Sequence, residues 1–245
     1  MSEEFEGPGL DTGVWLPHYL PAWSSRAATR ATYEVSGSCL RLTVPPEQGL
    51  WCEGEHTPAM RVSGVQSGNF SGPVGSTVGQ QPYRAGLRVQ EAQPLFRGWL
   101  WSAGRLEMRA RMVLGPTSMA AWWMVGFEDV PTQCAEICVA EVFGKAVVPG
   151  ESAEVGMGLH AFRDPDVPED FAAPRLPIDV TQFHTYAVER TASRVAFFVD
   201  GEFVRECAGP PQYPLQHMIA VFDFPDGSGA PTPTPELVVD YLRAV

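Results

Sequence analysis

The sequence predicts an all-β protein, and three observations support this class. No window of about a dozen residues shows convincing 3.6-residue periodicity. Strand-like runs recur instead between glycine and proline residues from Thr32 to Leu242. Glycine (24) and proline (23) make up nearly a fifth of the 245 residues, against about 12% in average usage, while apolar residues reach 44%. This mixture is typical of many short strands joined by turns around a sizeable core.

Three segments are individually typical of strands. Residues 105–112 alternate polar and apolar side chains, which predicts one buried face and one solvated face. Residues 40–44 alternate in the same way before a Pro-Pro pair, and residues 183–188 form a third half-buried pattern. Each of these segments is therefore expected to lie in a sheet with one side on the core.

The sequence also predicts one hairpin. Residues 195–199 and 202–205 are strand-like runs that flank Asp200 and Gly201. An Asp-Gly pair tolerates the positive φ angles of a type I′ turn, which is the turn that suits two-residue hairpin connections. The two runs are therefore expected to pair antiparallel.

Long irregular segments interrupt the strand-like runs at 45–83, 163–179 and 225–236. Loops of this length usually carry function or disorder. None has the composition of an interdomain linker followed by a new core, and no internal repeat is evident. We therefore expect residues 1–245 to form a single domain.

The net charge of −12 excludes two classes of partner. Nucleic acids and anionic membranes both require clustered lysine and arginine, and here the arginines are scattered among acids. No stretch is apolar enough for a membrane span, and residues 1–6 lack the features of a signal peptide. We expect a cytoplasmic monomer, or a secreted protein if the chain has been trimmed, that binds a neutral ligand.

The cysteines stand at positions 39, 52, 134, 138 and 207, an odd set without short repeated spacing. This pattern fits reduced, buried thiols better than a disulfide framework or a zinc site.

Residues 134–144 place two carboxylates, Glu136 and Glu141, in an otherwise apolar run. An unpaired charge inside a core is costly, so these side chains should face something else. Because side chains alternate along a strand, Glu136 and Cys138 share a face, whereas Glu141 joins them only if a β-bulge inserts one residue. The alternative is that the two glutamates face opposite sides and are separately solvated or paired.

Residues 136–141, Glu-Ile-Cys-Val-Ala-Glu, resemble the Glu-x-Asp-x-x-Glu active-site strand of glycoside hydrolase family 16, with Cys138 in place of the aspartate. Residues 104–111 are similar to the family's Gly-Arg-(aromatic)-Glu-x-Arg-Ala strand, and residues 121–124 to its Ala-Phe-Trp-Leu segment. Later segments that resemble the family follow in the same order, at 183–189, 199–201 and 239–243. The resemblance covers about residues 105–245.

The resemblance implies a concanavalin A-like jelly-roll β-sandwich of two antiparallel sheets with an open concave cleft. It also implies retaining, endo-acting hydrolysis of a β-linked glucan, most like the laminarin-type β-1,3-glucan, with Glu136 as nucleophile and Glu141 as general acid/base. No cofactor is required for this chemistry. In related proteins the position of Asp240 can contribute to a structural calcium site, so Asp240 is a candidate calcium ligand; the alternative is a carboxylate that caps a turn.

Cys138 is the main departure from the family pattern. In matching enzymes the central aspartate hydrogen-bonds the nucleophile, whereas a thiol is a weak donor and is neutral near pH 7. Slower turnover, a shifted pH optimum or loss of activity follows as a hypothesis. Two alternatives to hydrolysis are therefore a lectin-like glycan-binding protein and a transglycosylase.

Aromatic rings stack on the apolar faces of sugars, so tryptophans are candidate substrate platforms. The candidates near the catalytic strand are Trp122 and Trp123, with the family counterpart of Trp123 lining the cleft. Further candidates, which are alternatively core residues, are Trp51, Trp99 and Trp101. His160 is expected on the neighbouring strand, where it would either contact a sugar hydroxyl or serve a structural role. Arg190 stands where the family usually has a tryptophan.

Overall fold

A computed structural model describes residues 1–226 and 233–245 of the protein. Part of the long segment expected at 225–236 therefore lies outside the described residues. The two helices of the described part are single 3-10 turns, η1 (Pro21–Trp23) and η2 (Gly144–Ala146). No helix among the described residues has the length and apolar character needed to span a membrane.

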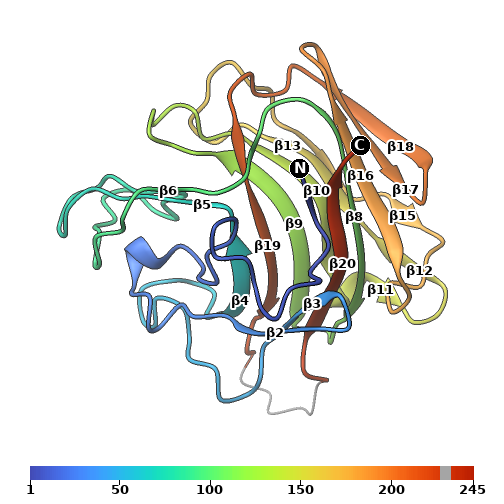
Figure 1. Ribbon diagram of the computed structural model, residues 1–245, viewed down its shortest axis with the longest axis horizontal. Coiled ribbons are helices and arrows are strands. Elements are labelled where there is room, and N and C mark those ends of the chain that lie inside the picture. The colour runs from blue at the N-terminus through green and yellow to red at the C-terminus, as the bar shows by residue number, and fades with distance from the viewer. Residues whose placement is uncertain (227–232) are drawn as a thin grey trace.

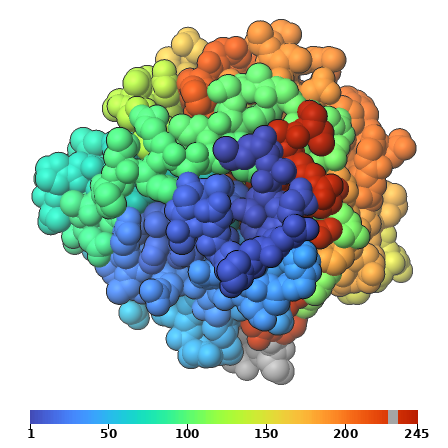
Figure 2. Space-filling model, viewed as in Figure 1, coloured from blue at the N-terminus to red at the C-terminus, as the bar shows by residue number. Residues whose placement is uncertain are grey.

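Sheet A is one of two large antiparallel layers (Figure 1). Its strand order is β18-β17-β16-β8-β20-β3-β2, and β1 pairs with β20. The bounds of its strands are β1 Ser2–Glu3, β2 Thr32–Ser36, β3 Cys39–Thr43, β8 Gly104–Val113, β16 His184–Arg190, β17 Arg194–Val199, β18 Glu202–Ala208 and β20 Glu236–Ala244. In Figure 2 the blue N-terminal segment and the red C-terminal strand lie side by side, as the pairing of β1 with β20 requires.

Sheet B is the second layer, with the order β14-β13-β10-β9-β19-β4 and β7 paired with β19. The bounds of its strands are β4 Arg61–Gln66, β7 Leu100–Trp101, β9 Ser118–Gly126, β10 Glu136–Phe143, β13 Gly156–His160, β14 Asp170–Ala172 and β19 Leu215–Asp223. Two small sheets complete the fold, one of β5 Gly68–Asn69 and β6 Phe96–Arg97, the other of β11 Val147–Val148, β12 Ser152–Glu154 and β15 Arg175–Leu176. The predicted all-β sandwich is confirmed.

The main core lies between the two sheets. Sheet A contributes the apolar positions of β8, which alternate with arginines and a glutamate on its other face: Leu106, Met108, Ala110 and Met112. Sheet B contributes alternate residues of β19, among them Leu215, Ile219 and Val221. The alternation at 105–112 therefore marked the inward face of β8 correctly.

The predicted hairpin is also present. β17 and β18 pair antiparallel, and the turn residues Asp200 (φ 52°) and Gly201 (φ 83°) both occupy the left-handed region. The segments predicted at 40–44 and 183–188 correspond to β3 and β16, each displaced by one or two residues.

A second apolar cluster covers the other face of sheet B. It joins side chains of β9 and β19 to residues from the long N-terminal segments, including Trp23, Trp51 and Leu87. Sheet B is consequently buried on both faces, and all nine residues of β9 are buried. A strand covered on both sides does not alternate in sequence, which explains why β9 shows no period-two pattern.

Candidate active site

A β-bulge in β10 brings the predicted catalytic residues onto one face. The register of β10 shifts after Cys138 against both neighbours, by Ala140 on the β9 side and by Glu141 on the β13 side. Val139 and Ala140 both pack into the core between the sheets, whereas Glu136, Cys138 and Glu141 all line one cleft. The predicted bulge is confirmed, and the alternative with the glutamates on opposite faces is excluded.

The cleft lies on the outward face of sheet B and has a volume of about 170 Å³. β9, β10 and β19 form its floor, and the segments before η1 and β6 contribute to its walls through Tyr19 and Gln81. The lining residues are Tyr19, Gln81, Ala121, Trp123, Glu136, Cys138, Glu141 and Phe222. The two carboxyl groups and the thiol of β10 therefore share this cleft with three aromatic rings.

Glu136 is a buried carboxyl that has no cationic partner in the part of the chain that the structure describes. Its residue is 7% exposed, and its one side-chain hydrogen bond within the described residues comes from the Nε2 amide of Gln81. Burial raises the pKa of Glu136 to about 8, and the Gln81 hydrogen bond acts in the opposite direction. Nearby carboxylates, Glu128 first among them, raise the pKa further. In the unliganded site, burial therefore favours the neutral form of Glu136 near pH 7.

Glu141 is half-buried, and burial also raises its pKa, while the neighbouring His160 acts to lower it. A carboxyl that stays protonated near neutral pH can act as a general acid. His160 faces Glu136 across the β10–β13 pair, its Nδ1 lies 2.6 Å from Oε1 of Glu169, and its ring stacks on Phe171 at 4.6 Å. A hydrogen bond from His160 to a sugar remains a prediction.

The Cys138 thiol lies between the two glutamates on the cleft face and is 3% exposed. Burial raises the pKa of Cys138 well above its usual range, and the two neighbouring glutamates add to this effect. The thiol is therefore neutral and adds no charge to the site.

The candidate tryptophans divide between the cleft and the core. Trp123 lines the cleft beside Phe222. Trp122 is fully buried between the sheets because it is adjacent to Trp123 on β9 and points the opposite way, and Trp99 and Trp101 lie in the same core. The prediction that Trp122 and Trp101 contact substrate is therefore wrong.

Trp51 is also buried, but on the cleft side of sheet B. Its ring packs edge-on against Tyr19, His56 and Tyr83 at centroid distances of 5.0–5.4 Å. Trp51 thus supports Tyr19, which lines the cleft.

Arg190 lies in β16 of sheet A, away from the cleft. It is 4% exposed, its guanidinium donates to the carbonyl of Tyr213, and it stands 5.6 Å from the ring of Trp101. Arg190 therefore has a structural role in this chain, and sheet B provides the aromatic lining of the cleft without it.

A calcium ion at Asp240 remains a prediction. The carboxylate of Asp240 forms an ion pair with Arg109 at 2.5 Å, so its charge is already compensated by a cation. The described residues contain no group of three or more histidine, cysteine, aspartate or glutamate side chains that could hold a metal ion. All five cysteines are free, and four of them are buried, as predicted.

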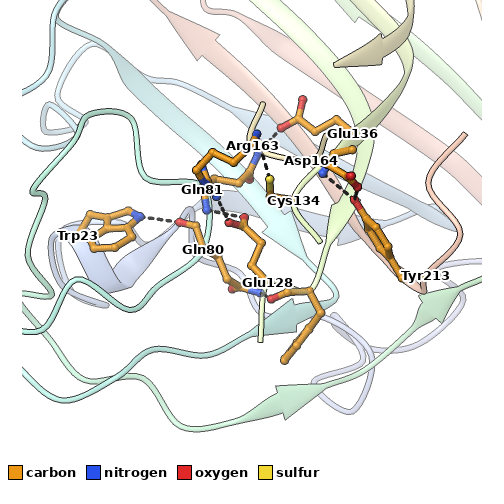
Figure 3. A network of polar contacts seen from close by, with 11 residues as sticks. Trp23, Gln80, Gln81, Glu128, Cys134, Glu136, Arg163, Asp164 and Tyr213 are labelled. Atoms are coloured by element: carbon orange, nitrogen blue, oxygen red, sulfur yellow. Dashed lines mark hydrogen bonds and ion pairs between the residues drawn. The ribbon is translucent and has the colours of Figure 1, made fainter. Parts of the chain in front are cut away.

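Sequence reasoning missed Tyr19, Gln81 and Phe222 in the cleft, and Glu128 behind it. Gln81 lies within the long segment 45–83 that was expected to carry function, but no motif distinguishes it there. Figure 3 shows Gln81, which lines the cleft, in a polar network with Glu128 and Arg163. Only the three-dimensional structure connects these distant segments.

No protein-family model matches the sequence, and neither does any curated protein. Among solved structures, the fold is similar to that of a GlcNAcα1-4Gal-releasing endo-β-galactosidase from Clostridium perfringens, with a TM-score of 0.82 and 25% identity. That match covers 99% of this chain and 61% of the other, so the chain spans about three fifths of that protein's length.

Two β-glucanases are also similar in fold. The catalytic domain of a laminarinase from Thermotoga petrophila matches with a TM-score of 0.66 and 18% identity, covering 99% of this chain and 95% of the other. A non-specific endo-β-1,3(4)-glucanase from family GH16 matches with a TM-score of 0.65 and 16% identity, covering 99% and 88%. The protein therefore has the fold of endo-acting glycoside hydrolases of the GH16 type.

Proposed function

We propose that the protein is an endo-acting, retaining glycoside hydrolase, with Glu136 as the nucleophile and Glu141 as the general acid/base. The observation that carries this proposal is the bulge in β10, which places both carboxyls on one cleft beside Trp123. Neither glutamate has an arginine or lysine partner among the described residues, so neither is held in a structural ion pair.

The proposed reaction has two steps. The protonated carboxyl of Glu141 gives its proton to the leaving glycosidic oxygen while ionised Glu136 attacks the anomeric carbon and forms a glycosyl-enzyme ester. Glu141, now ionised, removes a proton from water, and that water attacks the anomeric carbon and releases Glu136. Burial raises the pKa of Glu141, which favours its acid role in the first step. Trp123 offers an apolar ring face for a sugar.

Two substrate classes are candidates. The resemblance of the sequence favours a laminarin-like β-1,3-glucan. The higher TM-score to the endo-β-galactosidase, 0.82 against 0.66, favours a glycan with internal β-galactosidic bonds. We give the β-galactosidic glycan precedence because the 25% identity of that match also exceeds the identities of the two glucanases.

The test incubates the wild type with laminarin, lichenan, agarose and a mucin-type glycan that carries GlcNAcα1-4Gal ends. Reducing ends and released oligosaccharides are measured, with Glu136→Gln as the blank. Release by the wild type but not by Glu136→Gln supports hydrolysis, and the glycan that is cleaved decides between the two classes. Changed chain lengths without new reducing ends would indicate transfer to a sugar, and no product from any glycan would contradict the enzymatic proposal.

A lectin-like function is the second candidate, and the observation that favours it is the neutral Cys138 thiol beside a largely protonated Glu136. In that case the wild type would bind one of these glycans, measured by calorimetry, without releasing product. Cys138→Asp would then be expected to introduce hydrolysis, because a carboxyl at this position can hydrogen-bond Glu136. Turnover by the wild type would exclude this candidate.

A further inference from the structure

Gln81 holds a backbone conformation that its surroundings must enforce. Its φ of 46° lies in the left-handed region, which residues other than glycine, asparagine and aspartate seldom adopt. Such conformations persist where neighbouring groups fix them, and they are frequent at functional sites. From this position the Gln81 side chain reaches Glu136, and its Nε2 donates to Oε1 of that carboxyl.

The buried carboxylate of Glu128, which is paired with the more exposed Arg163, fixes this backbone. The backbone N–H of Gln81 donates to Oε1 of Glu128 at 2.6 Å, and the other oxygen of Glu128 is paired with Nη2 of Arg163 at 2.5 Å (Figure 3). The side chain of Glu128 is only 2% exposed, so both of its oxygens depend on these protein partners. Both oxygens of Glu128 are thus occupied, one by the chain segment that carries Gln81 and one by a cation.

The residue before Gln81 is held as firmly. The indole Nε1 of Trp23 donates to the carbonyl oxygen of Gln80 at 2.6 Å, and the Gln80 amide donates to the carbonyl oxygen of Phe127 at 2.9 Å. Phe127 directly precedes Glu128 in the chain. The segments around residues 80 and 128 are therefore joined by two independent contacts, which leaves Gln81 little freedom.

We propose that Gln81 is a positioning residue for the carboxyl of Glu136, and that the Glu128–Arg163 ion pair holds Gln81 in this role. The inference rests on the proposed function, in which Glu136 must ionise and attack. An amide N–H donates a better hydrogen bond to a carboxylate than to a neutral carboxyl, so Gln81 favours the ionised nucleophile. Cys138 does not supply this donor, because its thiol donates weakly.

Other titratable groups face Glu136 and enter any measurement of its ionisation. Tyr19 approaches Glu136 from the N-terminal segment, and Cys138 and Glu141 neighbour Glu136 on β10. His160 faces Glu136 from β13, and Glu128 and Glu169 act on it from the neighbouring loops. The first experiment therefore compares variants that leave all of these groups in place.

The first experiment follows the Glu136 carboxyl by ¹³C NMR titration, with its signal assigned from its loss in Glu136→Gln. Gln81→Asn keeps an amide and tolerates positive φ but is one methylene too short to reach, and Gln81→Met removes the donor altogether. Both variants are expected to raise the pKa of Glu136 by about one unit. Gln90→Met, an exposed position later in the same segment, is the matched control and should leave the titration unchanged.

A titration of Gln81→Met and Gln81→Asn that coincides with the wild type would overturn the proposal. This readout does not require turnover, so it distinguishes failure of the positioning role from failure of the proposed hydrolysis. If the wild type hydrolyses a glycan, kcat at pH 7 should fall about tenfold in both variants, with KM little changed. A change confined to KM would also contradict a positioning role.

The second experiment tests Glu128. Glu128→Gln retains an oxygen that can accept from the Gln81 backbone, whereas Glu128→Ala removes it. Both variants remove the carboxylate charge that raises the pKa of Glu136, so they are compared with each other. We expect a higher pKa of Glu136 in Glu128→Ala, which no longer holds the Gln81 backbone, than in Glu128→Gln. Equal titration of Glu128→Ala and Glu128→Gln, with circular dichroism showing both folded, would exclude Glu128 from this role.

Discussion

Two glutamates, Glu236 in sheet A and Glu136 in sheet B, are equally buried at 7% exposure, yet their surroundings differ completely. Glu236 is paired with two arginines, Arg41 at 2.5 Å and Arg111 at 2.9 Å. Glu136 has only the neutral amide of Gln81, and its pKa rises to about 8. A buried acid that is paired with cations has its charge compensated within the fold, whereas one left without a cation is available for chemistry.

The largest effect is expected on kcat/KM, which should depend on Glu141 of sheet B and not on Glu236 of sheet A. We expect Glu141→Gln to lower kcat/KM on the natural glycan by about 10²–10⁴-fold, because the leaving oxygen loses its proton donor. Aryl glycosides with good leaving groups should retain most of their rate of the first step. Glu236→Gln is the matched control in sheet A and should keep the wild-type kcat/KM once the folded fraction is taken into account.

A Glu→Gln substitution should change the free energy of unfolding in opposite directions at positions 136 and 236. Because the pKa of Glu136 is raised in the folded state, the stability that this group contributes is fully present below about pH 4.5. It is lost as the pH rises toward about 8. Glu136→Gln removes this loss and should stabilise the fold at pH 8.5 by on the order of 3 kcal/mol, with a much smaller gain at pH 4.5.

Glu236→Gln should instead destabilise the fold at pH 8.5, by about 1–2 kcal/mol, because it leaves Arg41 and Arg111 without their anion. Thermal unfolding at both pH values measures the two changes. Shifts in Tm of the same sign for both variants at pH 8.5 would contradict the inferred difference between the unpaired Glu136 and the paired Glu236.

The adjacent tryptophans of β9 offer a smaller contrast. Trp123→Ala should raise KM for the glycan and lower kcat/KM about tenfold, since a stacked ring contributes about 1–2 kcal/mol. Trp122→Phe should lower Tm through imperfect core packing while leaving kcat/KM of the folded protein unchanged. A similar loss of kcat/KM in both variants would indicate that Trp123 acts only through the structure of the floor.

The smallest effect is expected at a pair that is charged but exposed. Arg194 and Glu206 form a salt bridge at 3.0 Å between β17 and β18, with both side chains about half exposed. Water and salt screen such pairs, so Glu206→Gln should change Tm by less than about 2 °C. A larger change would mean that pairing alone, and not burial together with pairing, determines the contribution of Glu236.

Local patterns predicted much of the fold and part of the site. The alternation in β8 and the Asp-Gly turn between β17 and β18 were predictable because each depends only on neighbouring residues. Spacing alone left open whether the two acids of β10 share a face, and the resemblance to the Glu-x-Asp-x-x-Glu strand favoured the bulge. Each of these inferences needed only a few adjacent residues and the period of a strand.

The rest depends on contacts between distant segments. β9 is buried on both faces, so no alternation indicated that Trp123 faces the cleft and Trp122 the core. Gln81, Glu128 and Arg163 lie far apart in the sequence and have no motif, although they form one network that reaches Glu136 through Gln81. Asp240 also appeared suitable for a cation site, and only the structure shows that Arg109 already occupies that role.

Because β9 is buried on both faces, its amide protons should be among the last to exchange with solvent. All nine of its residues are buried, and hydrogen bonds to β10 and β19 occupy both of its edges. Its amide protons can meet water only when the sheet as a whole opens, so their exchange with deuterium should follow global unfolding. The floor beneath Glu136 should thus be among the last parts of the protein to exchange, long after the surface turns have done so.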